Sequence, residues 1–224
     1  MKHPFYQKTK KEQNRFIIKL VLSVLALNLI CFYLAFISGL YIISILIFCI
    51  SLSIIAPFVD TPSLKQQGKL IYHSLFFITE KAKNNVVTVH GGTLLDYYFV
   101  LGKYPNLKDK TTIILQQYVE GLLHFIETCE TNGEKQLEVK GTSYIINTRT
   151  AKKLGFKVAS ADGFQKMILL YNFFNLTISN SLAKGKLRFP KLKNTKTYHS
   201  DIKTLIDKKS YIKNLNTRLK ASLS

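Results

Sequence analysis

The sequence has no charged residue from Leu20 through Val59, and this gap divides the chain more clearly than any motif does. The surrounding apolar region separates into two stretches, residues 16–37 and 40–59, with Ser38-Gly39 between them. Each stretch is about long enough to cross ~30 Å of hydrocarbon at about 1.5 Å per residue. We therefore predict a two-helix transmembrane hairpin that turns at Ser38-Gly39.

The charge gap has two other interpretations. A cleaved signal peptide would have a shorter apolar run and a small-residue cleavage site, and no second apolar stretch would follow directly. A pair of core helices in a soluble protein rarely extends this far without charge.

Residues 20–59 also lack the intramembrane carboxylate, Lys or Arg that transporters use for ions. Asn28, near the middle of the first span, is expected to bond across the hairpin or to another copy.

Acidic residues are scarce, with 13 Asp and Glu against 32 Lys and Arg and a net charge of +19. Positive charge flanks both outer ends of the hairpin, which predicts that both termini are cytoplasmic. Residues 1–15 then form a basic cytoplasmic arm, and residues 184–224 carry twelve Lys or Arg against Asp201 and Asp207. Such a surface favours membrane lipids with anionic headgroups as partners, although a merely solvated cytoplasmic face has the same composition. The tail has too few interleaved aromatics for base stacking, so nucleic acid is not an expected partner.

Cysteine is sparse as well. Cys31, Cys49 and Cys129 have no C-x-x-C spacing, which argues against a disulfide or zinc framework and fits a reducing cytoplasm. The five histidines form no H-x-x-x-H pair, so neither a metal nor a cofactor is expected. A composition rich in Lys, Ile and Asn is typical of AT-rich bacterial genomes, and we therefore predict a bacterial inner-membrane protein.

Pro57 is expected to close the second span, and the polar residues 60–69 are predicted to be a linker. Residues 70–224 then form a basic α+β domain, because strands and helices alternate there without a regular βαβ rhythm. The expected elements of this domain begin with a β-hairpin over 69–91 with Asn84-Asn85 in its turn, helices over 94–101 and 110–133, and a strand pair over 135–147 turning at Lys140-Gly141. They continue with a helix over 148–155 capped by Asn147 or Thr148, a strand at 156–160, a long helix over 162–185 capped by Asp162, a strand at 196–199 and a terminal helix.

His90-Gly91-Gly92-Thr93 follows a β-branched run and precedes an apolar stretch that carries Asp96. Thr93 is placed to cap the next helix, with Asp96 in its first turn. Two glycines at a strand end most often provide a positive φ or close packing, and the segment is then a strand-to-helix turn. The functional alternative is a pocket in which His90 is the general acid or base and Asp96 orients it. Backbone N–H groups of Gly91, Gly92 and Thr93 would then bind an anion.

A second polar cluster begins the helix predicted at residue 148. Arg149 and Thr150 lie in its first turn, where Arg149 could bind an oxyanion through two N–H groups. We predict that these two residues complete the anion-binding set with residues 91–93. The alternative is an ordinary capped helix that ends at Gly155.

The segment His90-Gly91-Gly92 resembles the His-Gly-Gly segment that helps to form the oxyanion hole of lipase-like α/β-hydrolases. That resemblance implies a G-x-S-x-G turn, and the nearest stretch, Gly141–Ile145, has Ile where the last glycine belongs. Ser143, Asp162 and His199 follow the hydrolase order of nucleophile, acid and base. Order alone has little weight, because the strand–turn–helix context of the nucleophile is missing.

Two classes of function remain. The lack of a complete catalytic set favours a scaffold or accessory subunit of a membrane complex, whose domain docks protein partners. The alternative is a membrane-anchored enzyme that acts on an anionic lipid-linked or phosphorylated substrate, with His90 and Asp96 in its pocket. Loss of activity in a folded His90→Ala variant would separate the second class from the first.

Overall fold

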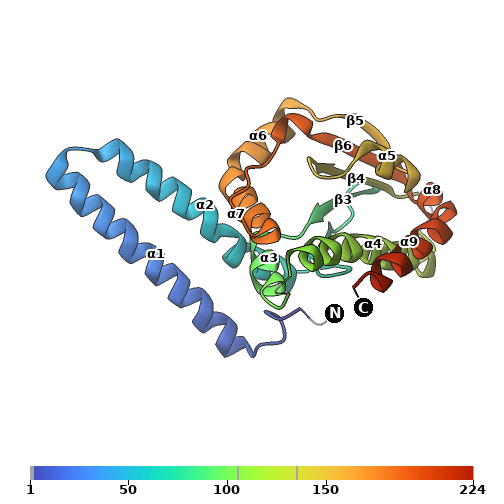
Figure 1. Ribbon diagram of the computed structural model, residues 1–224, viewed down its shortest axis with the longest axis horizontal. Helices are drawn as coiled ribbons and strands as arrows, with labels where there is room; N and C mark the ends of the chain where they lie inside the picture. Colours follow the sequence, from blue (N-terminus) through green and yellow to red (C-terminus); the bar gives the residue numbers. More distant parts are fainter. Residues whose placement is uncertain (1–2, 105, 135, 224) are drawn as a thin grey trace.

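The computed structural model describes residues 3–104, 106–134 and 136–223, and these residues form a mixed α+β structure (Figure 1). Two long apolar helices, α1 (Lys10–Ser38) and α2 (Tyr41–Gln66), project from a domain built on a six-stranded sheet. The prediction of an α+β domain is confirmed. Both helices are long and apolar enough to cross a membrane.

The helical hairpin turns at Gly39, whose φ of 74° is the left-handed conformation that glycine adopts most easily. Asn28 donates from Nδ2 to Ser51 Oγ at 2.9 Å, so the predicted bond across the hairpin is confirmed. Ser44 adds a second bond between the helices, from Oγ to the Cys31 carbonyl at 2.8 Å. Only 11% and 22% of the most apolar window of each helix is buried, unlike the core helices of a soluble domain.

The prediction that Pro57 closes the second helix is wrong, because α2 continues through Pro57 and Pro62 to Gln66. Proline has no N–H for the carbonyl four residues earlier, which for Pro57 is that of Ser53. Asn175 supplies the missing donor from its Nδ2, 2.8 Å from that carbonyl. Most of the predicted linker 60–69 is therefore helical.

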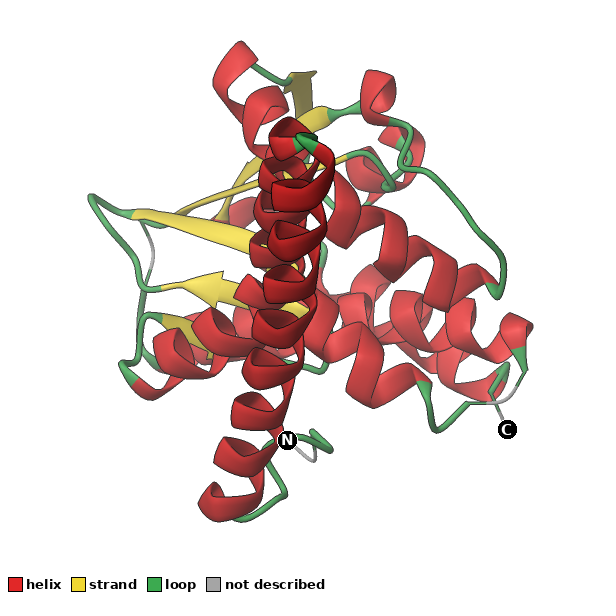
Figure 2. Ribbon diagram, turned by 90° about the vertical axis from the view of Figure 1, so that its left-hand side faces the viewer, coloured by secondary structure: helices red, strands yellow, loops and turns green. Residues whose placement is uncertain are grey.

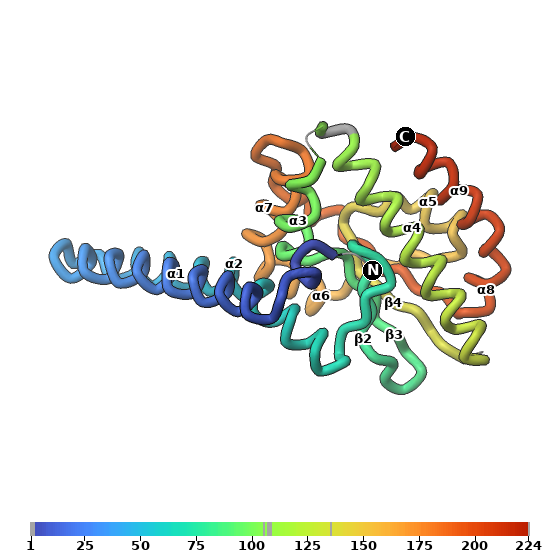
Figure 3. The backbone as a smooth tube through the Cα atoms, turned by 90° about the horizontal axis from the view of Figure 1, so that it is seen from below, coloured from blue at the N-terminus to red at the C-terminus, as the bar shows by residue number. Residues whose placement is uncertain are grey.

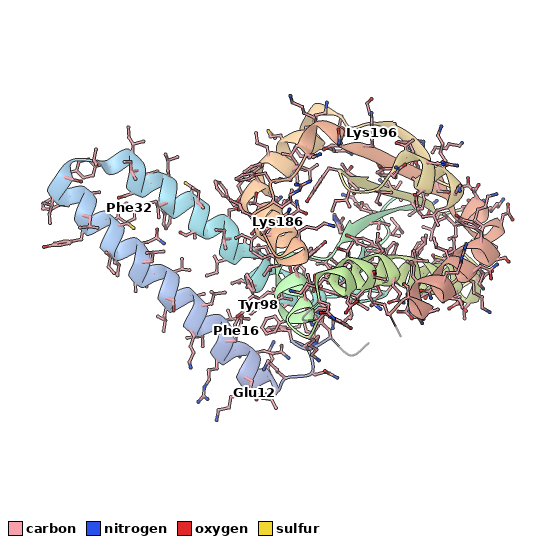
Figure 4. The ribbon with its side chains drawn as sticks, viewed as in Figure 1. Glu12, Phe16, Phe32, Tyr98, Lys186 and Lys196 are labelled. Atoms are coloured by element: carbon pink, nitrogen blue, oxygen red, sulfur yellow. The ribbon has the colours of Figure 1, made fainter. Side chains whose placement is uncertain are left out.

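The N-terminal segment is packed against the domain. Phe5 is fully buried in a cluster with Phe58 of α2 and with Leu94 and Leu95. Figure 4 shows Glu12 at the start of α1, where it forms a reciprocal capping box with Thr9. The base of the hairpin therefore shares a hydrophobic core with the domain, and the hairpin is docked rather than tethered.

The sheet has the strand order β1-β2-β3-β4-β6-β5. Only β3 and β4 are parallel among these neighbours, and the other four pairings are antiparallel. The predicted turn at Asn84-Asn85 is confirmed, since both residues have the positive φ that a type I′ hairpin requires. The strands are β1 (Leu70–Tyr72), β2 (Phe77–Glu80), β3 (Val86–Gly91), β4 (Glu138–Ser143), β5 (Lys157–Ser160) and β6 (Lys196–Asp201).

Two predicted strand segments differ from the structure. The chain reverses direction between β1 and β2, where Ser74 donates from Oγ to the Gln117 carbonyl at 2.6 Å. The strand pair predicted to turn at Lys140-Gly141 is the single strand β4, which pairs with β3 and β6. A Cβ on Gly141 would lie 3.1 Å from the Val89 carbonyl oxygen, so this glycine serves close strand packing rather than a turn.

The predicted long helix over 162–185 is divided at Asn172, whose Nδ2 donates to the Ile168 carbonyl at 2.9 Å and so competes with the helical backbone. The cap predicted at Asp162 is confirmed, and of the two candidate caps Asn147 and Thr148 the structure has Asn147. The remaining helices are α3 (Leu94–Leu101), α4 (Leu107–Thr131), α5 (Thr148–Lys153), α6 (Gly163–Tyr171), α7 (Phe173–Lys184), the 3₁₀ helix η1 (Leu192–Asn194), α8 (Ile202–Asp207) and α9 (Lys209–Ala221).

The helices of the domain gather mainly on one side of the hairpin and the strands on the other (Figure 2). Helix α4 packs on the sheet, with Phe125 and Ile126 against Phe77 and Val139, and α9 lies beside it (Figure 3). Helices α6 and α7 lie outside this core cluster, although α7 also packs against α3 and α4. They form a wall between the sheet and α2 (Figure 1).

Candidate functional site

The glycine turn joins β3, which ends at Gly91, to α3, which begins at Leu94. Thr93 caps α3 as predicted, and Asp96 completes the capping box by accepting from Thr93 N at 2.6 Å and Thr93 Oγ1 at 2.9 Å. The position of Asp96 in the first turn also complements the helix dipole. The local part of the sequence prediction is therefore confirmed.

Both glycines of this turn are required for close packing. A Cβ on Gly91 would lie 2.1 Å from the Tyr118 hydroxyl oxygen, and a Cβ on Gly92 would lie 2.3 Å from the Phe76 ring. The N–H of Gly92 donates to the Tyr118 hydroxyl, and burial raises the pKa of Tyr118 to about 12. This N–H already has a partner within the protein, so it is not free to bind an anion.

Asp96 is completely buried, and its histidine partner is His3 rather than His90. Nε2 of His3 lies 3.1 Å from Asp96 Oδ1, in a geometry that makes the contact electrostatic rather than a hydrogen bond. Tyr72 donates from its hydroxyl to the same oxygen at 2.9 Å. Burial, and then the Asp96 carboxylate, raise the pKa of Tyr72 far above its usual value. The structure thus places Asp96 in an internal cluster that ties the N-terminal segment to α3.

His90 lies on β3 opposite Ile78, with its Nε2 2.7 Å from Glu80 Oε1. The two side chains are 45% and 51% exposed, so solvent reaches this pair, whereas the Asp96 cluster is buried. The structure does not bring His90 and Asp96 together. The carboxylate next to His90 is Glu80, which the sequence analysis did not single out.

Arg149 and Thr150 are exposed in the six-residue helix α5, and Asn147 caps that helix by accepting from the Arg149 N–H at 2.7 Å. Neither side chain lines the cavity described below, whereas Gly91, Gly92 and Thr93 do. The structure therefore does not assemble the predicted anion-binding set.

The hydrolase arrangement is also not assembled. Ser143 ends strand β4, and its Oγ accepts from the N–H groups of Ile145 and Ile146. Asp162 caps α6, and His199 lies within β6 opposite Lys140. The nucleophile elbow needs a strand–turn–helix at the serine, and a serine in a paired strand does not provide it.

A cavity of about 520 Å³ lies between the sheet and the wall of α6 and α7. Its volume lies within the range of about 300–1,000 Å³ that is usual for small-molecule sites. Helix α2 contributes Pro57, Thr61 and Leu64, so the cavity reaches the base of the hairpin. Its lining is mainly apolar and comes from segments far apart in the sequence, including Val89, Leu122, Ile168, Leu169 and Leu176.

Four tyrosines line this cavity, and hydrogen bonds within the protein engage their hydroxyl groups. Tyr198 donates to the Ile146 carbonyl at 2.5 Å, Tyr144 donates to Asn180 Oδ1 at 3.2 Å, and Tyr97 and Tyr118 bond to each other. Burial raises the pKa of all four hydroxyls. The tyrosines therefore stay neutral and mainly add ring surface to the wall.

Asn175 supplies a polar group to the cavity wall from α7. The residue is 6% exposed, and its Nδ2 is used by the Ser53 carbonyl. Its Oδ1 has no hydrogen-bond partner among the described residues. A buried acceptor of this kind favours a ligand with a hydroxyl or amide donor.

Comparison with known proteins assigns no family. No family model matches the chain, and neither a curated protein nor a solved structure matches it. Within the described residues, no group of three or more His, Cys, Asp or Glu side chains is arranged to hold a metal ion. The site must be interpreted from its own geometry.

Sequence analysis did not find the cavity, because its walls come together only in the tertiary structure. A local signal was that residues 163–184 are apolar on nearly all sides. This pattern is typical of a helix that has apolar surroundings on two opposite faces. In the structure, Ile168 and Leu169 line the cavity while Phe164 and Leu170 are exposed.

Proposed function

We propose that this protein is a membrane-anchored accessory protein of the bacterial inner membrane, whose cytoplasmic domain takes the apolar chain of a membrane lipid into its cavity. The single observation that carries the proposal is the apolar cavity at the base of the hairpin. A bound lipid would make the domain a lipid-loaded scaffold for protein partners in a membrane complex.

Anchoring is supported by the composition and exposure of the hairpin. Its two helices carry no charge over residues 20–59, and their apolar side chains remain largely exposed. Basic residues flank both outer ends and none lies in the turn, which favours cytoplasmic termini. A lipid bilayer is the environment in which such a surface is stable.

The location of the cavity supports lipid as its ligand. Pro57 lines it and belongs to the uncharged segment, so one end of the cavity lies at the level of the proposed membrane. A lipid chain that enters there would exchange one apolar environment for another. The Asn175 acceptor would bind a hydroxyl or amide near the head of that chain.

The enzyme alternative retains one supporting observation, which is that His90 and Glu80 line the same cavity as a 2.7 Å pair. A carboxylate beside an imidazole is a common arrangement for a general base. Under this alternative Glu80 rather than Asp96 orients His90, and the substrate is the lipid in the cavity.

The test is mass spectrometry of small molecules extracted with the protein in native lipid patches. Ser179 lines the cavity from α7, so Ser179→Phe should fill part of it and reduce the co-purified lipid. Thr150→Phe is the matched control, because it adds the same ring at an exposed position on α5. Equal lipid content in the two variants would contradict the proposal.

His90→Ala distinguishes the two candidate functions in the same experiment. An accessory lipid-binding protein should retain its lipid, because His90 lies at the rim of the cavity and is half exposed. An enzyme should instead accumulate an unprocessed lipid that is absent from the wild-type sample. A changed lipid mass in folded His90→Ala would therefore favour the enzyme.

A further inference from the structure

The domain exposes an apolar surface beside the hairpin. We call it the α6 face, and it consists of four α6 residues and two from the loop after α7: Phe164, Met167, Leu170, Tyr171, Leu187 and Phe189. Each of these side chains is between 58% and 70% exposed. A soluble surface rarely presents this many large apolar groups together, and such patches mark sites of association.

Two contacts fix the depth of the α6 face relative to the hairpin. Asn175 bonds to the Ser53 carbonyl, and Ser53 Oγ lies 3.4 Å from the Tyr171 carbonyl oxygen. Ser53 precedes Val59, the last residue of the uncharged segment, by about 9 Å of helix. Helices that lie in a membrane interface bury their apolar face by about 5–10 Å. The junction of α6 and α7 is therefore at the depth of an interfacial helix.

The direction of α6 matches this depth. Helix α6 runs across the long axis of the hairpin rather than along it, as Figure 1 shows, so its axis can lie in the plane of a bilayer that the hairpin crosses. Phe164, Met167 and Tyr171 follow the spacing i, i+3, i+7 and share one face of the helix. The opposite side of α6 contributes Leu169 to the cavity wall.

Charge around the α6 face identifies the kind of membrane. From residue 163 to residue 200 the sequence has seven Lys or Arg and no Asp or Glu. Figure 4 shows Lys186 just after α7 and Lys196 on β6, at the two ends of the loop that carries Leu187. Phe189 of this loop stacks on Phe173, with ring centroids 6.0 Å apart. Anionic headgroups attract such a segment by about 1 kcal/mol for each basic residue near the surface.

We propose that the α6 face is a second membrane-binding surface, inserted among the headgroups and upper acyl chains of an anionic bilayer next to the hairpin. The inference rests on the proposed membrane anchoring and adds a contact that the hairpin alone does not provide. It makes α6 a thin wall with bilayer on one side and the lipid cavity on the other. A second copy of the chain would instead cover the face with protein, and the experiment separates the two.

The sequence contains no Trp, so a single introduced Trp reports on its own position. Leu170→Trp places the reporter on the α6 face, Leu27→Trp places one in the middle of the hairpin, and Tyr211→Trp places one on exposed α9, far from the hairpin. Each full-length variant is reconstituted into vesicles that contain phosphatidylglycerol. Lipids brominated near the headgroup or deep in the chain then quench Trp fluorescence according to depth.

We expect shallow bromines to quench Leu170→Trp strongly, deep bromines to quench Leu27→Trp, and neither to quench Tyr211→Trp. Quenching of Leu27→Trp without quenching of Leu170→Trp would overturn the inference while leaving the membrane anchor intact. Blue-shifted but unquenched Leu170→Trp would assign the face to a second copy and would overturn it too. Loss of quenching at Leu27→Trp would refute the membrane anchor itself.

A variant with fewer cations tests the contribution of anionic lipid. Lys186→Gln combined with Arg188→Gln removes two exposed cations beside the α6 face and leaves its apolar side chains unchanged. Quenching of Leu170→Trp in this background should decrease in vesicles with phosphatidylglycerol and stay unchanged in phosphatidylcholine vesicles. An equal loss in both vesicle types would contradict the role of anionic lipid.

Discussion

Two histidine–carboxylate pairs flank the glycine turn, and they differ in burial. His3 and Asp96 are fully buried, with a tyrosine hydroxyl and a helix cap on the same carboxylate. His90 and Glu80 are about half exposed at the cavity rim, with no such network among the contacts of the described residues. An imidazole and a carboxylate therefore hold the fold together in one place and remain open to a ligand in the other. Burial, rather than the residue types, separates the two roles.

The largest effect should follow from breaking the buried pair. Asp96→Ala removes one half of the α3 capping box and leaves the hydroxyl of Tyr72 without its acceptor, while His3 loses the carboxylate next to its Nε2. We expect a loss of about 3–5 kcal/mol in the free energy of unfolding. Denaturant unfolding in detergent micelles measures it, and a loss below 1 kcal/mol would show that the cluster is not structural.

The bond between the hairpin and α7 should give the next largest effect. Asn175→Ala leaves the Ser53 carbonyl without a donor, at a cost of about 1–3 kcal/mol. Pro57→Ala restores a backbone N–H for that carbonyl, so Asn175→Ala should cost less in this background. A double-mutant cycle on unfolding free energies tests the coupling. Additive costs would show that Asn175 acts elsewhere.

Acid should weaken the fold through His73, a third histidine, which is more buried than His90 and less buried than His3. Burial, and then His124, lower the pKa of His73 from 6.5 to about 4 in the folded protein. Because the unfolded chain binds the proton first, stability should fall as the pH decreases from about 6.5 to about 4. A shift of this size corresponds to about 3 kcal/mol in a fully buried group, and solvent around the partly exposed His73 reduces the loss to about 1–3 kcal/mol. His73→Gln keeps a hydrogen-bonding side chain near Thr79 without titrating there. The variant should lose stability less steeply over this pH range than the wild type.

The exposed pair should give the smallest effect on stability. Glu80→Gln and His90→Ala are each expected to change the free energy of unfolding by less than about 1 kcal/mol, as for other exposed pairs. The same substitutions should leave the thermal transition near that of the wild type. A loss comparable with that of Asp96→Ala would remove the contrast between the two pairs.

Local signals in the sequence were sufficient to predict most helices and strands, but not which residues contact one another in the fold. Thr93 and Asp96 were predictable as a cap because they lie three residues apart in the chain. The contact of Asp96 with His3 was not predictable, because the whole hairpin and the first three strands separate the two residues in the chain. Gly141 suggested a turn, and only its neighbours in β3 and β6 show that it belongs in a strand.

The same limitation applies to the candidate site. The functional alternative placed His90, Gly91, Gly92 and Thr93 in a polar anion-binding pocket with Asp96. The structure places these four residues at an apolar cavity and Asp96 in a buried cluster with His3. The far wall of this cavity on α6 and α7 begins some 70 residues later and could not be inferred from the glycine turn. Pro57 was predicted to end α2 because proline usually does so, and Asn175 supplies the donor that lets the helix continue.

The Asn175–Ser53 bond has a consequence for biosynthesis. Its two residues are 122 positions apart, so the ribosome makes Asn175 about 6 to 24 seconds after Ser53 at normal elongation rates. During that interval the Ser53 carbonyl has no donor from Asn175. If the hairpin is inserted in a membrane as proposed, this carbonyl would lie where water is scarce until the domain that is made later supplies the donor. Folding of the hairpin would then be complete only after the domain has folded.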